Sequence, residues 1–384
     1  MRLPERDPAG LAYLERRQQD DAFTYLVDIS PKGDDAYLDL ARALMRAGAY
    51  PPGTDEASVA RTLRQSHEVP DPSRWSAYER PDHRLRLWRA EQTVARGLAS
   101  LGQVLPAPLP ALGTLSTWQL NARAIPVPST GGYVIAFDSG LFSFTAGWAK
   151  VLAACLTHVQ NGGLLDRFVD LCFCQIILGT AAYLDWRPMA NPQLEVLSER
   201  FDPGFEAFLL GHEYAHVALG HQPVDLSVAS GAEPAQGFRR DEELDADALG
   251  FEVVLKAFPD PVHTYVSVAG YFCALQLMER GYGLLQGDAR AIPPGDSHPP
   301  VAERRASLFN RANALLSAEA LAQAIAQVRL LEDRTLQLWL PLEPCFWHGS
   351  EGMPEGWQPR SPQEKSAALL AFKWYCLEAP ASPH

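Results

Sequence analysis

The chain has 384 residues, 47% of them hydrophobic and 10% aromatic, which is enough to bury at least one large core and excludes a disordered protein. The formal net charge is −13, and basic residues form only short pairs such as Arg239-Arg240. We therefore expect no nucleic-acid partner, because phosphate binding needs a clustered positive surface. The six cysteines lack zinc-ribbon and disulfide-scaffold spacing, and the first residues lack the apolar core of a signal peptide, so we expect a cytoplasmic protein.

The first 104 residues are predicted to form a helical N-terminal region. Apolar residues recur at intervals of three and four in segments 34–48 and 83–102, which is the period of an α-helix. The proline-rich segment 105–113 then marks a boundary, after which we expect a central domain over residues 105–310. Within it, "YVIAF" at residues 133–137 is the clearest strand of the chain, because it is rich in β-branched and aromatic residues and is bounded by turn residues.

Two helices are expected next, at residues 141–159 and 164–184. The second contains the most apolar window of the chain, residues 168–184, but Asp170 and Gln175 interrupt it, and it falls short of the roughly 20 residues needed to cross a bilayer. We therefore interpret it as a buried core helix and expect no integral membrane insertion.

The stretch "GHEYAHVALGH" at residues 211–221 carries the strongest functional signal. Asp202 can cap a helix there and Pro203 can occupy its first turn, and the helix is predicted to stop near Gly220. Three histidines and one glutamate fall within this stretch, which raises the question of which of them hold a metal.

His212 and His216 lie four residues apart, so their imidazoles project from one face of the helix and can share a tetrahedral metal. Glu213 cannot easily ligate the same ion. It can instead accept a proton from a metal-activated water as the water attacks a carbonyl, and deliver that proton to the leaving amine. His221 is the nearest candidate for a third ligand, but a continued helix would turn it about 140° away from His216, and the metzincin spacing is not met. We therefore expect His221 to support a ligand from behind or to lie at the surface.

A better third ligand lies in the next helix, which is predicted at residues 241–258. Glu243 and Asp247 are four residues apart on one face, so Glu243 can reach the metal while Asp247 accepts a hydrogen bond from the far nitrogen of a ligating histidine. The alternative is that this acidic helix start simply complements the helix dipole. We infer Zn²⁺ from the nitrogen and carboxylate ligands, which also suit other divalent metals.

Helices are expected further along at residues 263–280 and 301–316. Residues 311–384 are expected to form a helical C-terminal extension that includes a tail rich in tryptophan and proline at 345–365. The whole pattern predicts an α+β protein that is mainly α, with a small sheet.

The chain resembles the gluzincin zinc peptidases, and among them the family that contains HtpX-type heat-shock proteases and CAAX prenyl proteases. Many members of that family are embedded in membranes, whereas this chain is expected to be a soluble member. The resemblance covers about half of the chain and rests on four blocks in the right order: "NARAIPVPSTGGYVIAFDSGLF" at 121–142, "HEYAHVALGH" at 212–221, "ELDADALG" at 243–250 and "SHPPVAER" at 297–304.

The resemblance implies a gluzincin-like metallopeptidase core, with a small sheet and an active-site helix, between helical flanking regions. It implies that zinc is held by His212, His216 and Glu243, that Glu213 is the general base, and that Asp247 supports a ligating histidine.

It also implies that His298 and Arg304 lie near the substrate. His298 can stabilise an oxyanion, and Arg304 can anchor the His298 loop or bind a substrate carbonyl or carboxylate. The strand at 133–137 is implied to lie at the edge of the sheet and to pair with an extended peptide substrate. The substrate-binding residues would then be Gly132, Tyr133, Val134, Ile135 and Ala136.

Three functional hypotheses follow. The first is a zinc-dependent endopeptidase that hydrolyses peptide bonds in a protein or peptide substrate. The second is a non-catalytic zinc-containing scaffold or regulatory protein that binds a protein partner. The third is a protease held inactive until a regulatory partner opens its cleft. Structural zinc sites carry four protein ligands and catalytic ones leave a position for water, so the three ligands found here favour the protease.

Overall fold

A computed structural model of the chain describes residues 3–20, 53–67, 81–115, 120–128, 130–157, 192–222, 236–286 and 298–343, together with short pieces between them. The described part is mainly helical, with one three-stranded sheet and one two-stranded ribbon, which confirms the expected α+β, mainly α class. Most of the predicted helix at 164–184 and all of the tail at 345–365 lie outside the described residues.

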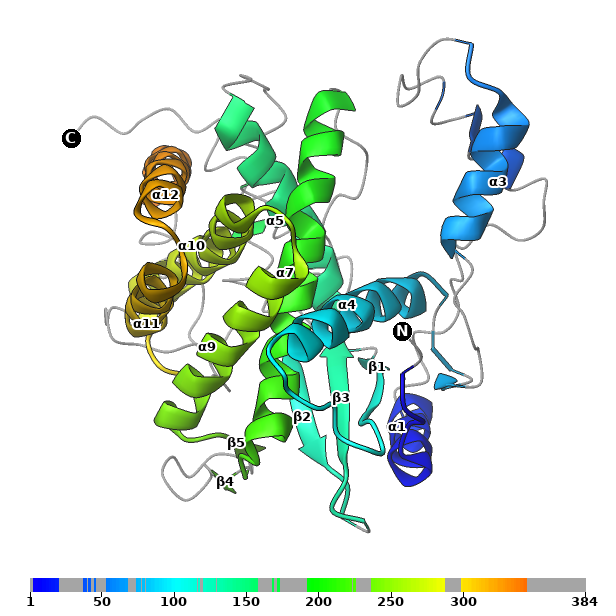
Figure 1. The fold of residues 1–384 in the computed structure, drawn as a ribbon. Coiled ribbons are helices and arrows are strands. Elements are labelled where there is room, and N and C mark those ends of the chain that lie inside the picture. Colours follow the sequence, from blue (N-terminus) through cyan, green and yellow to red (C-terminus); the bar gives the residue numbers. More distant parts are fainter. Residues whose placement is uncertain are drawn as a thin grey trace.

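The helices confirm the predictions at 141–159, 241–258, 263–280 and 301–316. Figure 1 shows the sheet lying below α4 and beside one half of α7, while α10, α11 and α12 lie on the other side of α7. The described helices are α1 (Pro8–Asp20), α3 (Glu56–His67), α4 (Pro81–Ser100), α5 (Ser139–Thr157), α7 (Pro192–Leu219), α9 (Arg240–Ala257), α10 (Pro261–Gln286), α11 (Val301–Leu315) and α12 (Ala318–Trp339).

The three-stranded sheet consists of β1 (Ala111–Leu115), β2 (Ala122–Pro126) and β3 (Tyr133–Asp138). β3 is the central strand, parallel to β1 and antiparallel to β2. The predicted strand at 133–137 is therefore confirmed, but its predicted place at the sheet edge is wrong. β3 is buried along almost its whole length, as expected for a strand with a neighbour on each side, whereas β2 is half-exposed.

Side chains close the outer edge of β1 at Thr114. The Thr114 backbone N–H donates to Glu79 Oε2 at 2.7 Å, and the Thr114 carbonyl accepts from Gln18 Nε2 at 2.8 Å. The Thr114 hydroxyl also donates to Glu79, at 2.5 Å, and α1 packs against the strand. The outward backbone groups at this position are satisfied, so no further strand can pair with them.

The outer edge of β2 has no strand partner among the described residues. Backbone hydrogen bonds at both ends of the β2–β3 pair place the odd-numbered residues of β2 in hydrogen-bonded pairs with β3. Ala122 and Ala124 therefore point their N–H and C=O groups away from β3, and no described strand pairs with them. Pro126, the next residue in this row, has no N–H to offer, so the row of outward donors ends there.

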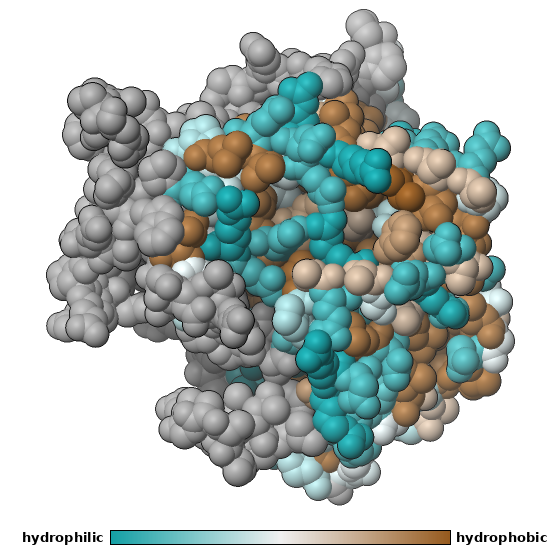
Figure 2. All heavy atoms as spheres, turned by 90° about the vertical axis from the view of Figure 1, so that its left-hand side faces the viewer, coloured by the Kyte–Doolittle hydropathy of each residue, from teal (hydrophilic) through white to brown (hydrophobic). Residues whose placement is uncertain are grey.

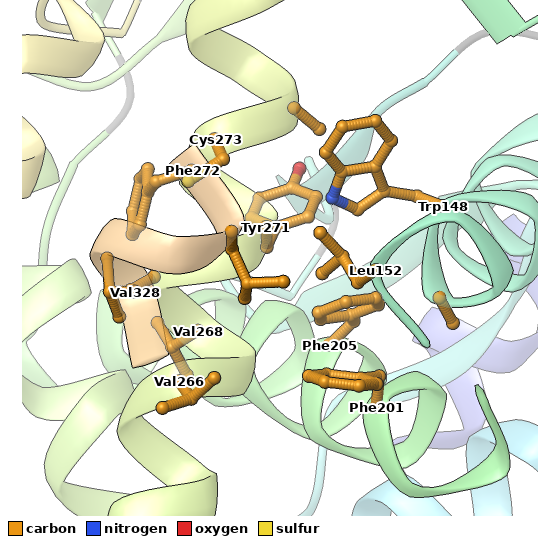
Figure 3. Close-up of a cluster of buried hydrophobic side chains, with 14 of the residues drawn as sticks. Trp148, Leu152, Phe201, Phe205, Val266, Val268, Tyr271, Phe272, Cys273 and Val328 are labelled. Atoms are coloured by element: carbon orange, nitrogen blue, oxygen red, sulfur yellow. The ribbon is translucent and has the colours of Figure 1, made fainter. Parts of the chain in front are cut away.

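The main core lies where α5, α7, α10 and α12 meet. Figure 3 shows aromatic side chains converging there, with Trp148 from α5 near Tyr271 from α10, and Phe201 and Phe205 from α7 stacked below them. Trp148 Nε1 donates to the carbonyl of Gly270 at 2.8 Å, so its polar atom is satisfied inside the core. This core fixes α7 from the side opposite the sheet.

The predicted N-terminal and C-terminal regions contribute to the same cores as the central region. α4 packs against α7 and α9, and α12 packs against α10 and α5. α3 instead projects away from the main body, next to α4 (Figure 1).

A buried polar contact ties the N-terminal segment to α7. Arg6 Nη2 donates to Glu91 Oε2 at 2.9 Å, and the Tyr214 hydroxyl donates to Glu91 Oε1 at 2.8 Å. All three residues are buried, so each needs these partners. The carboxylate on α4 thereby joins the residue that follows Glu213 to the first described segment of the chain.

α7 begins earlier than its sequence pattern predicts. The helix starts at Pro192 and continues through Pro203, so the prediction that Asp202 caps its start is wrong. The Asp202 carboxylate accepts from Arg86 Nη2 of α4 at 2.7 Å instead of capping a helix end. The predicted end of the helix is confirmed, because α7 ends at Leu219 and Gly220 follows with a φ of 69°.

α5 is the described helix that is long and apolar enough to cross a membrane by length and composition, and 67% of its apolar window is buried inside the structure. Figure 2 shows hydrophilic and hydrophobic residues interspersed over the face that carries α11 and α12.

Candidate metal centre

Glycines let α9 approach α7 closely enough to bring the two motifs together. A Cβ atom at Gly250 of α9 would lie 2.9 Å from the backbone nitrogen of His212, and one at Gly97 of α4 would lie 2.1 Å from the carbonyl oxygen of Val253. Neither position has room for a side chain, so α9 lies between α7 and α4 at backbone contact. This crossing places the acidic first turns of α9 against the histidines of α7.

Three predicted ligands converge at this crossing. His212 Nε2 lies 3.1 Å from His216 Nε2 and 3.3 Å from Glu243 Oε2, and His216 Nε2 lies 3.9 Å from Glu243 Oε1. Bonds of about 2.0–2.1 Å from a tetrahedral zinc would place neighbouring ligand atoms roughly 3.3 Å apart. The observed separations therefore fit one small cation between the three side chains.

The electrostatics of the site also fit a cation. Glu243 Oε2 is buried, and the ring nitrogens of His212 and His298 each lie 3.3 Å from it, longer than an ordinary hydrogen bond. Burial alone would lower the pKa of His212, but its hydrogen bond to Asp247 and its contact with Glu243 outweigh burial and raise that pKa to about 10. Burial, and then the charge on His212, hold the pKa of His216 far below its usual range, so His216 is neutral. The site thus favours positive charge between a neutral imidazole and a carboxylate.

Asp247 and Arg304 support His212 from behind. His212 Nδ1 lies 3.0 Å from Asp247 Oδ1, and the Arg304 guanidinium donates to both Asp247 oxygens at 2.7 Å. Burial would raise the pKa of Asp247, but Arg304 and His212 hold it well below its usual range, so the carboxylate stays charged. Arg304 also lies over the ring of Phe272, at 5.0 Å from the ring centroid.

Arg304 is thus buried against Asp247, and it does not face an open cleft as a substrate-binding residue would. The physical reason is that α11 packs against α9, which brings the start of α11 to the far side of the predicted metal ligands. Arg304 thus contacts Asp247, and Asp247 in turn contacts His212.

His298 lies on the open side of the site. Its Nε2 atom is 3.3 Å from Glu243 Oε2, and its side chain is 28% exposed. Ligand atoms of His212, Glu243 and His298 all lie within 4.8 Å of one another. His298 can therefore donate to a charged oxygen beside the cation, and it is also near enough to become a further ligand.

Glu213 is buried next to the predicted ligand cluster and beside the outer edge of β2. Its carboxylate accepts a hydrogen bond from the Ala124 backbone N–H. Burial raises the pKa of Glu213, although the positive charge on His212 opposes the shift. A carboxyl whose pKa lies above its ordinary value is better matched to proton transfer near neutral pH.

The structure does not place the five predicted substrate-binding residues along an open strand edge. Val134, Ile135 and Ala136 are buried in the central strand, with β1 on one side and β2 on the other, so their backbone cannot pair with a substrate. Tyr133 contacts the loop after α7, because its hydroxyl donates to the His221 carbonyl at 3.1 Å. Gly132 lies against Asp7, at a point where a Cβ atom would be 2.4 Å from Asp7 Oδ2.

His221 is buried against His216, as a supporting histidine and not a surface histidine would be. Its Nδ1 atom lies 2.9 Å from Nδ1 of His216, on the side of that ring opposite the ligand cluster. The extrapolation of the helix fails because the chain turns at Gly220 and does not continue. The signal that would have revealed this is the glycine itself, since a glycine just after a helix commonly folds the next residue back along it.

Comparisons with protein-family models, with curated proteins and with solved structures find no match. The function is therefore argued from the geometry and chemistry of the site.

Proposed function

We propose that this protein is a zinc-dependent endopeptidase of the gluzincin type, acting on a protein or peptide substrate. The observation that carries the proposal is the convergence of His212, His216 and Glu243 at cation-binding separations, with Glu213 buried beside them. A divalent cation at this site supplies Lewis-acid activation of water and of the scissile carbonyl.

Glu213 acts as the general base and then as the general acid. Its carboxylate takes a proton from the attacking water as the new carbon–oxygen bond forms, and it passes that proton to the nitrogen as the carbon–nitrogen bond breaks. The hydrogen bond from Ala124 fixes the carboxylate in place. His298, on the exposed side, donates from Nε2 to the oxygen on which negative charge develops.

The substrate pairs with β2 and not with β3. Ala122 offers an outward N–H and C=O and Ala124 an outward C=O, while the Ala124 N–H is donated to Glu213, so an extended peptide bonded to this edge passes the base. Main-chain pairing of this kind binds the peptide with little regard to its sequence. Pro126 limits the pairing to a short stretch.

The decisive test is a Glu213→Gln variant. It should bind zinc like the wild type, because the ligands are untouched, and it should lose hydrolysis of an unfolded protein such as casein by about a hundredfold or more. Zinc content by atomic absorption and peptide release measure the two properties separately. Equal hydrolysis by variant and wild type would refute the mechanism.

A second candidate is a non-catalytic zinc scaffold that binds a protein partner, and the position of His298 favours it. If His298 Nε2, 3.3 Å from Glu243, completes a shell of four protein ligands, no position is left for water. A His298→Ala variant separates the two. The protease should keep its zinc and lose turnover, whereas the scaffold should lose zinc affinity and show no hydrolysis in either form.

A further inference from the structure

His216 is enclosed by two residues that the proposed mechanism does not use. His221 approaches it edge-on through the two Nδ1 atoms, 2.9 Å apart. Phe238 stacks on the face of the His216 ring, with the ring centroids 3.6 Å apart and the planes at 13°. Both neighbours are buried, so the imidazole has a fixed surrounding on the side away from Glu243.

The end of α7 builds the contact with His221. Gly220 adopts a left-handed conformation with a φ of 69°, the His221 N–H donates to the His216 carbonyl at 3.0 Å, and the Gly220 N–H donates to the Val217 carbonyl at 3.2 Å. These two bonds form the Schellman motif that commonly ends a helix. The motif reverses the chain, and it therefore returns His221 to the turn of the helix that holds His216.

Two other parts of the chain hold this arrangement. The Tyr133 hydroxyl at the start of β3 donates to the His221 carbonyl at 3.1 Å. The ribbon of β4 (Val224–Asp225) and β5 (Gln236–Gly237) returns the chain beside the end of α7, and Phe238 follows directly after it. His221 is thus fixed at its backbone as well as at its ring.

The proton positions follow from the geometry. His216 Nε2 points towards His212 and Glu243, so a metal there leaves Nδ1 to carry the hydrogen. That hydrogen is donated to His221 Nδ1, which accepts it while His221 Nε2 keeps its own hydrogen. A ligating histidine usually donates its second N–H to an acceptor, which fixes the tautomer and the ring orientation.

We propose that His221 is the positioning residue of His216, as Asp247 is of His212. The inference rests on the proposed metal centre and adds an asymmetry to it, because one ligand is supported by a charged carboxylate and the other by a neutral imidazole. A neutral acceptor orients His216 without adding a second negative charge behind the cation.

The test compares His221→Asn with His221→Phe. The Asn side chain can place an oxygen acceptor near the former Nδ1 position, whereas Phe fills the space and accepts no hydrogen bond. We expect His221→Phe to weaken Zn²⁺ binding about 10- to 100-fold and His221→Asn to stay within about threefold of the wild type, measured by competition with a chromophoric chelator. Equal losses in both variants, or wild-type affinity in His221→Phe, would overturn the proposal.

Two further measurements keep the outcome interpretable. Thermal unfolding of the metal-free proteins checks that both variants fold, and the d–d absorption of bound Co²⁺ reports ligand geometry independently of activity. If His221→Phe does not fold, Tyr133→Phe removes only the bond that holds the His221 backbone, and it should weaken Zn²⁺ binding a few-fold, about the value of one hydrogen bond. Unchanged affinity in Tyr133→Phe would then count against the proposal. A wild-type chain that binds no metal would overturn both the role of His221 and the proposed function. Metal binding without hydrolysis would overturn only the proposed function.

Discussion

Two buried glutamates stand at opposite edges of the three-stranded sheet. Glu79 lies outside β1 and accepts a hydrogen bond from the Thr114 N–H, while Glu213 lies outside β2 and accepts one from the Ala124 N–H. Burial raises the pKa of both carboxyls, in Glu79 to about 7. Glu79 also accepts from Gln18, whereas Glu213 adjoins His212. A raised carboxyl pKa is therefore not by itself a sign of catalysis, and the groups around the carboxyl decide its role.

The sharpest test of this comparison replaces each glutamate by glutamine. Glu213→Gln should lower hydrolysis about 10²- to 10⁴-fold, because it removes the proton acceptor. Glu79→Gln should leave the rate within about twofold, because the amide can still accept from Thr114 and Gln18. Initial rates on the same peptide measure both. A comparable loss in Glu79→Gln would show that the two edges do not differ in the way proposed.

Glu79, at the β1 edge, should make the unfolding free energy depend on pH. The folded pKa of Glu79, about 7, exceeds its ordinary value, so its contribution is fully present below about pH 4.5 and is lost as the pH rises through 7. The shift corresponds to about 3 kcal/mol. Between about pH 5 and about pH 8, urea unfolding should show a larger loss of unfolding free energy in the wild type than in Glu79→Gln, and the difference should be most of that amount.

Burial also raises the pKa of Glu206 to about 7. Glu206 is present in the wild type and in Glu79→Gln, so the difference in pH dependence between these two proteins reports Glu79 alone. An identical pH dependence in the two proteins would contradict the assignment.

Where α9 crosses α7, Gly250 should tolerate no added carbon. Gly250→Ala places Cβ 2.9 Å from the His212 backbone nitrogen, so α7 and α9 must separate, and we expect about tenfold weaker zinc binding and a cost of about 1–3 kcal/mol in unfolding free energy. Gly211→Ala is the matched control at the same crossing, because its nearest contact would be an ordinary 3.4 Å. It should bind zinc like the wild type, and equal effects in the two variants would exclude close helix approach as the cause.

The smallest expected effect concerns substrate pairing at the open edge. Ala122→Pro removes one outward N–H from β2, so KM for an extended peptide should rise roughly threefold to tenfold while zinc content stays unchanged. Ala124 is unsuited to this test because its N–H also holds Glu213. An unchanged KM would indicate that the peptide does not bind along β2.

The periodic spacing of apolar residues predicted most of the described helices, and the spacing of histidines and acidic residues predicted the candidate metal site. The histidines of α7 and the acidic pair of α9 lie together as expected from helix periodicity, because positions four apart share a face. β1 and β2 escaped prediction because each is five residues long, one contains a glycine and the other ends in proline. The edge position of β3 is implied only by the resemblance, and its pairing with a strand on each side contradicts it.

The remaining errors have a common cause, which is that contacts across the chain override local signals. The sequence predicts that Asp202 caps a helix, but its carboxylate accepts a hydrogen bond from Arg86 of α4. The resemblance places Arg304 near the substrate, and in the structure Nε and Nη2 of its guanidinium donate to Asp247. No spacing in the sequence reports such pairings, since they depend on how helices cross.

The link from Arg6 through Glu91 to Tyr214 bears on the order in which the molecule is completed. Tyr214 follows Glu91 by 123 residues, and at about 5–20 residues per second a ribosome needs on the order of ten seconds to make that stretch. We expect the arginine and the glutamate, which are synthesised first, to pair while the tyrosine is still missing. Glu243 and His298 emerge later still, so the candidate metal cluster can assemble only after the first half of the chain has been made.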